Sequence, residues 1–153
     1  MIPRYQSNLI SFAYPENWKL TDSDQEHLPR EISVESPEGT LWVMHAFAPG
    51  TDPQLLIDET IASFQQNYED FEWAEAATKL SIPPTRCIQA HFFCLDFLVT
   101  AQIMVFTHTP LTYLVIHQAE SRQFEKTASV MEAITTSLIT SVPQSEDDPD
   151  EGQ

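Results

Sequence analysis

Residues 40–47, with the sequence TLWVMHAF, carry apolar side chains on both faces of a predicted β-strand. Successive side chains of a strand point to opposite sides, so such a strand is buried only when protein covers it above and below. Residues 31–35 alternate between apolar and polar side chains, and Pro37 and Gly39 form a turn between the two runs. The pattern predicts a hairpin in an antiparallel sheet with a layer on each face.

Three β-rich runs later in the chain predict most of the remaining sheet. They are residues 86–97, 98–108 and 111–120. Thr109 and Pro110 separate the last two runs, whereas only Asp96 marks the corner between the first two. The register of these strands is therefore fixed only to within one residue, and a shift of one residue exchanges their buried and exposed faces. Residues 71–80 alternate like a strand after an acidic turn, although their alanines favour a helix. We expect a strand there, followed by a break at IPPT, residues 82–85.

The N-terminal part predicts a strand that ends in a corner. Residues 8–14 contain bulky apolar side chains, and Pro15 lacks the amide hydrogen that a strand ladder needs. Trp18 is then free to fold back over the core, and a short strand resumes at residues 19–21. Residues 22–30 have almost no apolar content and predict an exposed loop.

Two helices are predicted from capping residues and apolar periodicity. Asp52 is a capping carboxylate and Pro53 suits the first helical position, so a helix is expected to begin there and to run to about Glu69. Its core side chains recur at spacings of four, three and four: Ile57, Ile61, Phe64 and Tyr68. Ser121 is expected to cap a final helix over residues 122–139.

Together these elements predict an α+β fold, a central antiparallel β-sheet of about six strands sandwiched by helices (an α/β/α sandwich). The length of 153 residues and the hydrophobic content of 42% fit a single domain, residues 1–142. Residues 143–153 hold five acidic side chains and no apolar anchor, so we expect a disordered acidic tail.

The chain is strongly acidic, with 7 Lys and Arg against 23 Asp and Glu and a formal net charge of −16. This charge repels phosphate backbones and anionic lipid, and so it argues against nucleic-acid and membrane partners. It suits solubility or a basic protein partner.

The sequence predicts a cytoplasmic protein. It shows neither a charged leader followed by a long apolar run nor an apolar stretch long enough to span a membrane. Cys87 and Cys94 lie in one predicted strand, which separates their backbones by about 23 Å, far beyond disulfide reach. Two reduced thiols are therefore expected.

Four stretches of the chain resemble the PsbP/Mog superfamily, which includes DcrB-type bacterial proteins. They are YPENWK at residues 14–19, SPEG at 36–39, LLIDETIASFQQNY at 55–68, and the closing strands with the helix that ends in AITTSLI at 133–139. The resemblance covers roughly residues 7–140. It departs at one corner, where PPTRC stands in place of a glycine turn common in the family.

The resemblance implies a central antiparallel sheet between helices, in agreement with the residue patterns, and a structural role for Trp18 at the end of the sheet. It also implies protein binding without enzymatic activity. Members of the superfamily engage a small GTPase of nuclear transport, brace the photosynthetic oxygen-evolving complex, or serve as chaperones or adaptors for secreted effectors. No binding residue of the family can be placed on this sequence.

No arrangement of residues for catalysis is present in the sequence. The chain lacks a GxSxG elbow, and its 3 glycines leave no phosphate-cradling loop. Asp58 and Glu59 are adjacent on the first helix and point to different faces, so they do not form a catalytic pair. We therefore expect no enzymatic activity, no catalytic residue and no cofactor.

One alternative is a metal or small-ligand site built around Cys87 and His91. Their even spacing puts both on one face of a strand, and His117 or His45 is available on a neighbouring strand. Scattered histidines on apolar strands more often pack in the core or lie half-exposed, so we predict no metal ligand.

The surplus of aromatic side chains offers a second kind of binding site. It comprises Trp42, Trp73, Phe92, Phe93, Phe97, Phe106 and Tyr113. Most of them are expected in the core, but strands that are apolar on both faces can also leave an uncovered groove for a partner. Met44 and Met104 are the side chains expected to line such a groove, because methionine repacks easily.

The sequence thus favours a non-enzymatic protein-interaction domain of the PsbP/Mog type, an adaptor or assembly factor that binds a protein partner through its sheet face or acidic rim. Two alternatives stay open. One is a dimeric chaperone or adaptor for a secreted effector, and the other is a metal- or small-ligand-binding protein that uses Cys87 and His91. The identity of the partner and the oligomeric state are also left open.

Overall fold

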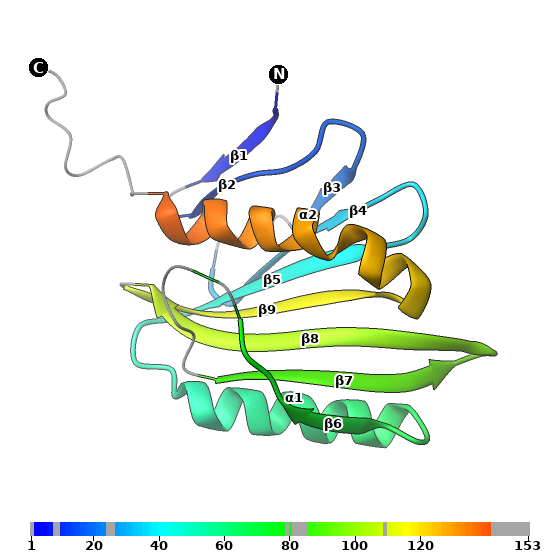
Figure 1. Ribbon diagram of the computed structural model, residues 1–153. Helices are drawn as coiled ribbons and strands as arrows, with labels where there is room; N and C mark the ends of the chain where they lie inside the picture. Colours follow the sequence, from blue (N-terminus) through cyan, green and yellow to red (C-terminus); the bar gives the residue numbers. More distant parts are fainter. Residues whose placement is uncertain are drawn as a thin grey trace, which may run out of the picture.

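The computed structural model describes residues 2–7, 10–23, 27–78, 80, 86–108 and 110–141. The strands within these residues are β1 (Arg4–Ser7), β2 (Ile10–Ala13), β3 (Lys19–Asp22), β4 (Arg30–Glu35), β5 (Leu41–Phe47), β6 (Glu72–Glu75), β7 (Arg86–Cys94), β8 (Phe97–His108) and β9 (Leu111–Glu120). The helices are α1 (Pro53–Asn67) and α2 (Ser121–Thr140). Seven strands form one antiparallel sheet in the order β3-β4-β5-β9-β8-β7-β6, and β1 and β2 form a separate two-stranded ribbon (Figure 1).

The central strands place apolar side chains in rows that alternate between the two faces of the sheet. One row belongs to the core cluster that includes α2: Met44, Val115, Met104 and Cys87. The next row belongs to the cluster that includes α1: Val43, Ile116, Ile103 and Ile88. Because neighbouring positions of a strand point to opposite sides, the two helices pack on opposite faces of these strands.

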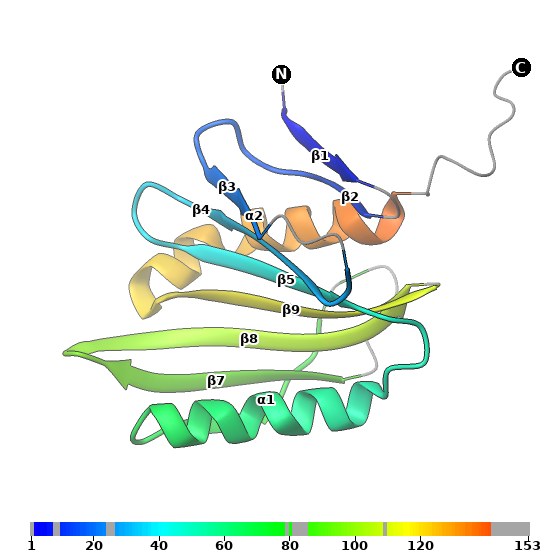
Figure 2. The same ribbon diagram turned by 180° about the vertical axis from the view of Figure 1, so that it is seen from behind.

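Each face has its own cover, as the two opposite views show (Figures 1 and 2). On one face, Ile57 and Ile61 of α1 pack in the core cluster. On the other face, Ile134 of α2 packs in the core cluster together with the β1–β2 ribbon. The ribbon reaches the sheet through Phe12, whose ring centroid lies 4.8 Å from that of Trp42 in β5.

The expected α+β fold around a large antiparallel sheet is confirmed, but two details of the prediction were wrong. The sheet has seven described strands rather than about six, with β3 and β6, each four residues long, at its two edges. Helices are not the whole cover, since the β1–β2 ribbon lies beside α2 (Figure 1). β1 has no counterpart in the prediction from sequence.

The predicted cap of α1 is confirmed, whereas the predicted cap of α2 was wrong. Asp52 Oδ1 accepts a hydrogen bond from the backbone N–H of Gln54 at 3.0 Å. Ser121 is the first residue of α2 rather than its cap, and Glu120 in the cap position makes no capping hydrogen bond through its side chain. The Ser121 hydroxyl instead shares a hydrogen bond of 2.7 Å with the hydroxyl of Thr100 in β8. In the described part of the chain, no helix is both long and apolar enough to cross a membrane.

The other predicted strands are present with shifted ends. The strand expected at residues 71–80 is shorter than predicted, because β6 ends at Glu75. Phe97 opens β8 instead of closing the strand before it. Trp18 is buried in the core cluster under α2, in keeping with a structural role. The expected break at residues 82–85 and the expected tail at residues 143–153 lie outside the described residues.

The exposed loop expected at residues 22–30 was wrong at its last residue, Arg30. It is the first residue of β4 and is buried. Its guanidinium forms an ion pair with Asp22 at 3.0 Å and donates a hydrogen bond to the Tyr5 hydroxyl at 2.6 Å. These contacts compensate the buried charge and fasten the β1–β2 ribbon to the edge of the sheet.

A histidine lies buried between β9 and α2. His117 Nε2 and Thr135 Oγ1 share a hydrogen bond of 2.8 Å, and Trp42 Nε1 donates to the same hydroxyl, also at 2.8 Å. Burial lowers the pKa of His117 to about 3, so the ring is neutral at neutral pH. Thr135 therefore links the helix to two strands of the sheet inside the core.

We expect His117 to make the fold sensitive to acid. The unfolded chain binds a proton on this ring near pH 6.5, whereas the folded chain does so only near pH 3. Stability is therefore full above pH 6.5 and falls as the pH drops through this window, by about 1.4 kcal/mol per unit.

Urea unfolding at pH 7 and at pH 4.5 checks this expectation against His117→Gln, which has no charge to gain. Over that range the wild-type protein should lose about 2–3 kcal/mol more stability than the variant. Both proteins carry the same carboxylates, so the difference isolates His117. Parallel stability profiles would contradict the expectation.

Candidate functional site

The structure separates the two residues considered for a metal site. Cys87 and His91 share a face of β7, as their spacing predicts, but stand about 13 Å apart along the strand. Cys87 is buried, and burial raises the pKa of its thiol to about 11. His91 is exposed, and its Nδ1 shares a hydrogen bond of 3.1 Å with Thr100 Oγ1. The described residues contain no group of three or more His, Cys, Asp or Glu side chains able to hold a metal ion.

The two other histidines considered for that site do not approach β7. His117 lies on β9, separated from β7 by β8, and bonds to α2. His45 lies on β5, where its Nε2 is 3.4 Å from Glu31 Oε1, and burial lowers its pKa. Both cysteines are free thiols, as expected.

The expectation that Met44 and Met104 line a groove for a partner was wrong. Both side chains are fully buried in the core under α2, because that helix and the β1–β2 ribbon cover this face. The aromatic surplus divides into a buried set and an exposed set. The buried set is Trp42, Phe92, Phe106 and Tyr113, and the exposed set is Trp73, Phe93 and Phe97.

Exposed apolar side chains gather at the end of the β7–β8 hairpin. In the described part of the chain eight large apolar side chains are exposed, and four of them fall within six consecutive positions. These four are Phe93, Leu95, Phe97 and Leu98, with exposed fractions of 52%, 89%, 58% and 39%. Residues 93–98 are called the hairpin tip below.

The hairpin tip projects beyond its neighbouring strands (Figure 1). The pairing of β9 with β8 ends at Val99, and the pairing of β6 with β7 ends at His91. Beyond these points only β7 and β8 pair, for example through Phe93 and Leu98. The tip therefore has no neighbouring strand on either side within the described residues.

Leu95 has a backbone conformation that costs free energy. Cys94 pairs with Phe97, so the hairpin closes through only Leu95 and Asp96. Leu95 has a φ of 59°, in the left-handed region where two-residue hairpin loops favour Gly, Asn or Asp. Residues with larger side chains are disfavoured there by roughly 1–2 kcal/mol. The most exposed of the large apolar side chains described thus occupies a position where the fold favours glycine.

An aromatic cluster anchors the base of the hairpin tip to α1. Phe92 is next to Phe93 in sequence but is buried on the opposite face of β7. Its ring centroid lies 4.5 Å from that of Tyr68, 5.4 Å from that of Phe64 and 5.8 Å from that of Phe71. The exposed side chains of the tip are therefore presented on a packed base.

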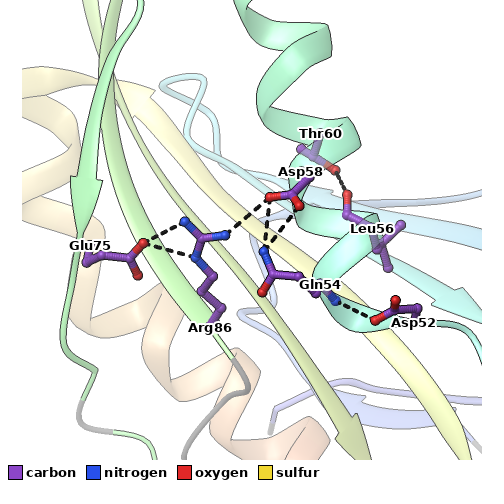
Figure 3. Close-up of polar contacts among 7 residues, drawn as sticks. All are labelled: Asp52, Gln54, Leu56, Asp58, Thr60, Glu75 and Arg86. Atoms are coloured by element: carbon purple, nitrogen blue, oxygen red, sulfur yellow. Dashed lines mark hydrogen bonds and ion pairs between the residues drawn. The ribbon is translucent and has the colours of Figure 1, made fainter.

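A charged network joins β6, β7 and α1 at the end of β7 away from the hairpin tip (Figure 3). Arg86 of β7 contacts Glu75 of β6 at 2.6 Å and Asp58 of α1 at 3.3 Å. The guanidinium also lies 5.4 Å from the centre of the Trp73 ring. The network therefore ties the first half of α1 to the last residue of β6.

An open depression of about 550 Å³ lies between the hairpin tip and the end of α1. Residues 67–70 line one side and residues 93–96 line the other. Glu69 and Asp70 place two carboxylates on the first side, and Asp96 adds a third beside the apolar residues of the tip. The depression thus combines apolar and acidic groups.

Leu95 and Leu98 are exposed residues of the hairpin tip that the sequence patterns did not single out. From the sequence, Phe93 and Phe97 were considered only as two members of the aromatic surplus. A signal was available in the run FFCLDFL, where a hairpin corner between two strands contains neither glycine nor asparagine. A large apolar residue at such a corner indicates a role other than turn formation.

No family model and no curated protein matches the chain. Similarity is found among solved structures. The cyanobacterial PsbP protein (CyanoP) from Synechocystis sp. PCC 6803 has a TM-score of 0.59 at 10% identity, covering 89% of this chain and 90% of that chain. PA94 from Pseudomonas aeruginosa, a protein of unknown function, has a TM-score of 0.48 at 9% identity, covering 94% of this chain and 97% of that chain. The similarity to CyanoP shows that the chain has a PsbP-like fold, as the resemblance in its sequence implies.

We expect Leu95→Gly to stabilise the protein. Glycine adopts a φ near 59° without the steric cost that a leucine side chain imposes. The free energy of unfolding, measured in urea, should rise by about 0.5–1 kcal/mol after allowance for the greater freedom of glycine in the unfolded chain.

Asp96→Gly is the matched control, because Asp96 is the other loop residue and has no positive φ. This change should leave stability unchanged or lower it. A loss of stability in Leu95→Gly would show that the fold needs the leucine side chain, and the account of the hairpin tip would be wrong.

Proposed function

We propose that this chain is a protein-interaction domain, which acts by binding a partner through the hairpin tip rather than by catalysis. The observation that carries the proposal is the exposure of Phe93, Leu95, Phe97 and Leu98 within one hairpin. Phe93 and Leu98 pair on one face of the hairpin and Phe97 lies on the other face, so the tip exposes apolar side chains on both faces. Such a concentration of exposed apolar side chains is typical of a contact site. The aromatic cluster under Phe92 supports the proposal, because it gives these side chains a fixed base.

The unfavourable backbone of Leu95 supports the same conclusion. The fold gains nothing visible from a leucine that is 89% exposed at a φ of 59°. Local strain of this kind is concentrated at functional sites, where a side chain is retained for what it contacts. A partner that buries Leu95 offers such a contact.

The four apolar side chains do not account for a stable complex by themselves. Burying them contributes roughly 1.5 kcal/mol each, or about 6 kcal/mol together. Association itself costs about 4–15 kcal/mol, so the tip alone supports only weak binding. A specific partner must also use groups next to the tip.

The charge of the chain limits the class of partner. A net charge of −16 supports a protein partner over nucleic acid or an anionic membrane. We also propose that the protein acts in the cytoplasm. The alternative of a secretion chaperone loses its expected groove, because Met44 and Met104 are buried. A chaperone that used the hairpin tip would bind its effector through the same four side chains.

Affinity capture from a lysate of the source organism, with quantitative mass spectrometry, tests the proposal. The wild-type protein is compared with the double variant Leu95→Ser, Phe97→Ser, which should recover a partner about tenfold less efficiently or worse. Both side chains are largely exposed, so the double variant should fold normally, and circular dichroism checks that it does.

Leu55→Ser is the matched control for the capture. Leu55 is 56% exposed near the start of α1, whereas the hairpin tip packs near the end of that helix. This variant should recover the partner as the wild-type protein does. Equal recovery by all three proteins would exclude the tip as the binding site, and the absence of any specific partner would refute the proposal.

A further inference from the structure

We infer that the hairpin tip binds a positively charged amphipathic segment of its protein partner. Apolar side chains of that segment cover the tip, and its Lys or Arg groups lie over the carboxylates of Glu69, Asp70 and Asp96. The inference rests on the proposed function and adds the chemistry of the partner.

The apolar and acidic groups line one depression. Glu69 and Asp70 come from the turn after α1, whereas Leu95 and Asp96 come from the hairpin loop. Asp70 has a φ of 61°, so the chain turns sharply there before β6 begins. A segment that packs on Leu95 therefore meets carboxylates on both sides of the depression.

The negative charge of the depression is uncompensated in the described part of the chain. No hydrogen bond or ion pair joins the side chains of Glu69, Asp70 or Asp96 to another described residue. Other carboxylates near the sheet are paired, as Glu75 is with Arg86. Exposed, unpaired carboxylates are ordinary on a protein surface, and it is their position beside the apolar tip that indicates a cationic ligand.

Charge complementarity selects the occupant of the tip. A chain with a net charge of −16 attracts cationic segments at a distance, and the depression places part of that charge next to an apolar contact. An apolar tip can also enter a lipid bilayer. The adjacent carboxylates oppose contact with anionic lipid, however, so a cationic protein segment fits both features better.

Two synthetic peptides of 16 residues with identical leucine positions test the inference. One carries lysine and the other glutamate at every polar position, and each bears a fluorophore for anisotropy titration. The wild-type protein should bind the lysine peptide about tenfold more tightly than the glutamate peptide in dilute salt. The preference should shrink in concentrated salt, because exposed charges are screened.

Two triple variants separate the site from the overall charge. The depression variant neutralises its carboxylates without changing their shape: Glu69→Gln, Asp70→Asn and Asp96→Asn. The control variant removes the same charge from exposed positions outside the depression: Glu16→Gln, Glu38→Gln and Glu59→Gln. The depression variant should weaken binding of the lysine peptide about tenfold, and the control less than about twofold. Equal weakening in both would overturn the inference, because overall charge would then explain the binding.

Vesicles of phosphatidylcholine, with and without phosphatidylglycerol, serve as a competing probe. Vesicle binding that is lost in Leu95→Ser, Phe97→Ser would overturn the inference in favour of a membrane. If the captured partner needs Leu95 and Phe97 but the depression variant binds the lysine peptide normally, the inference fails and the proposed function stands. If neither the partner nor the peptide needs the tip, both fail.

Discussion

Apolar side chains on both faces of β5, β8 and β9 are the constraint on which the rest of this structure depends. Ile103 and Met104 are neighbours in sequence, yet Ile103 packs in the cluster with α1 and Met104 in the cluster with α2. Covering both faces uses the two helices and the β1–β2 ribbon, so neither face of these central strands is free for a ligand. Binding is left to the rim of the sheet, its edge strands, loops and hairpin ends.

At one place on that rim the demands of folding and of binding diverge. Stability alone favours glycine or asparagine at position 95 and polar side chains at the positions around it. The chain instead carries Leu95 at a φ of 59° among exposed Phe93, Phe97 and Leu98. The buried aromatic cluster at Phe92 and the continuous pairing of β7 with β8 hold this arrangement in place. Sites that cost stability but contact partners are common on otherwise stable scaffolds.

The sequence predicts the fold where a local pattern decides the outcome and fails where a distant contact does. Asp52 caps α1 through its nearest neighbours, so its role is readable from sequence. Ser121 and Arg30 are placed by bonds to other strands, which no local pattern reveals. The candidate site was missed for a related reason. Phe92 and Phe93 are adjacent and chemically identical, and only the register of β7 buries the first and exposes the second.

The claim that a partner contacts the hairpin tip is tested most directly by hydrogen–deuterium exchange of the free protein and of its complex with the captured partner. The account predicts slower exchange in the complex at residues 92–98 and 67–70, with no change in β3 and β4 at the far edge of the sheet. Slower exchange confined to β3, β4 or the β1–β2 ribbon would contradict it.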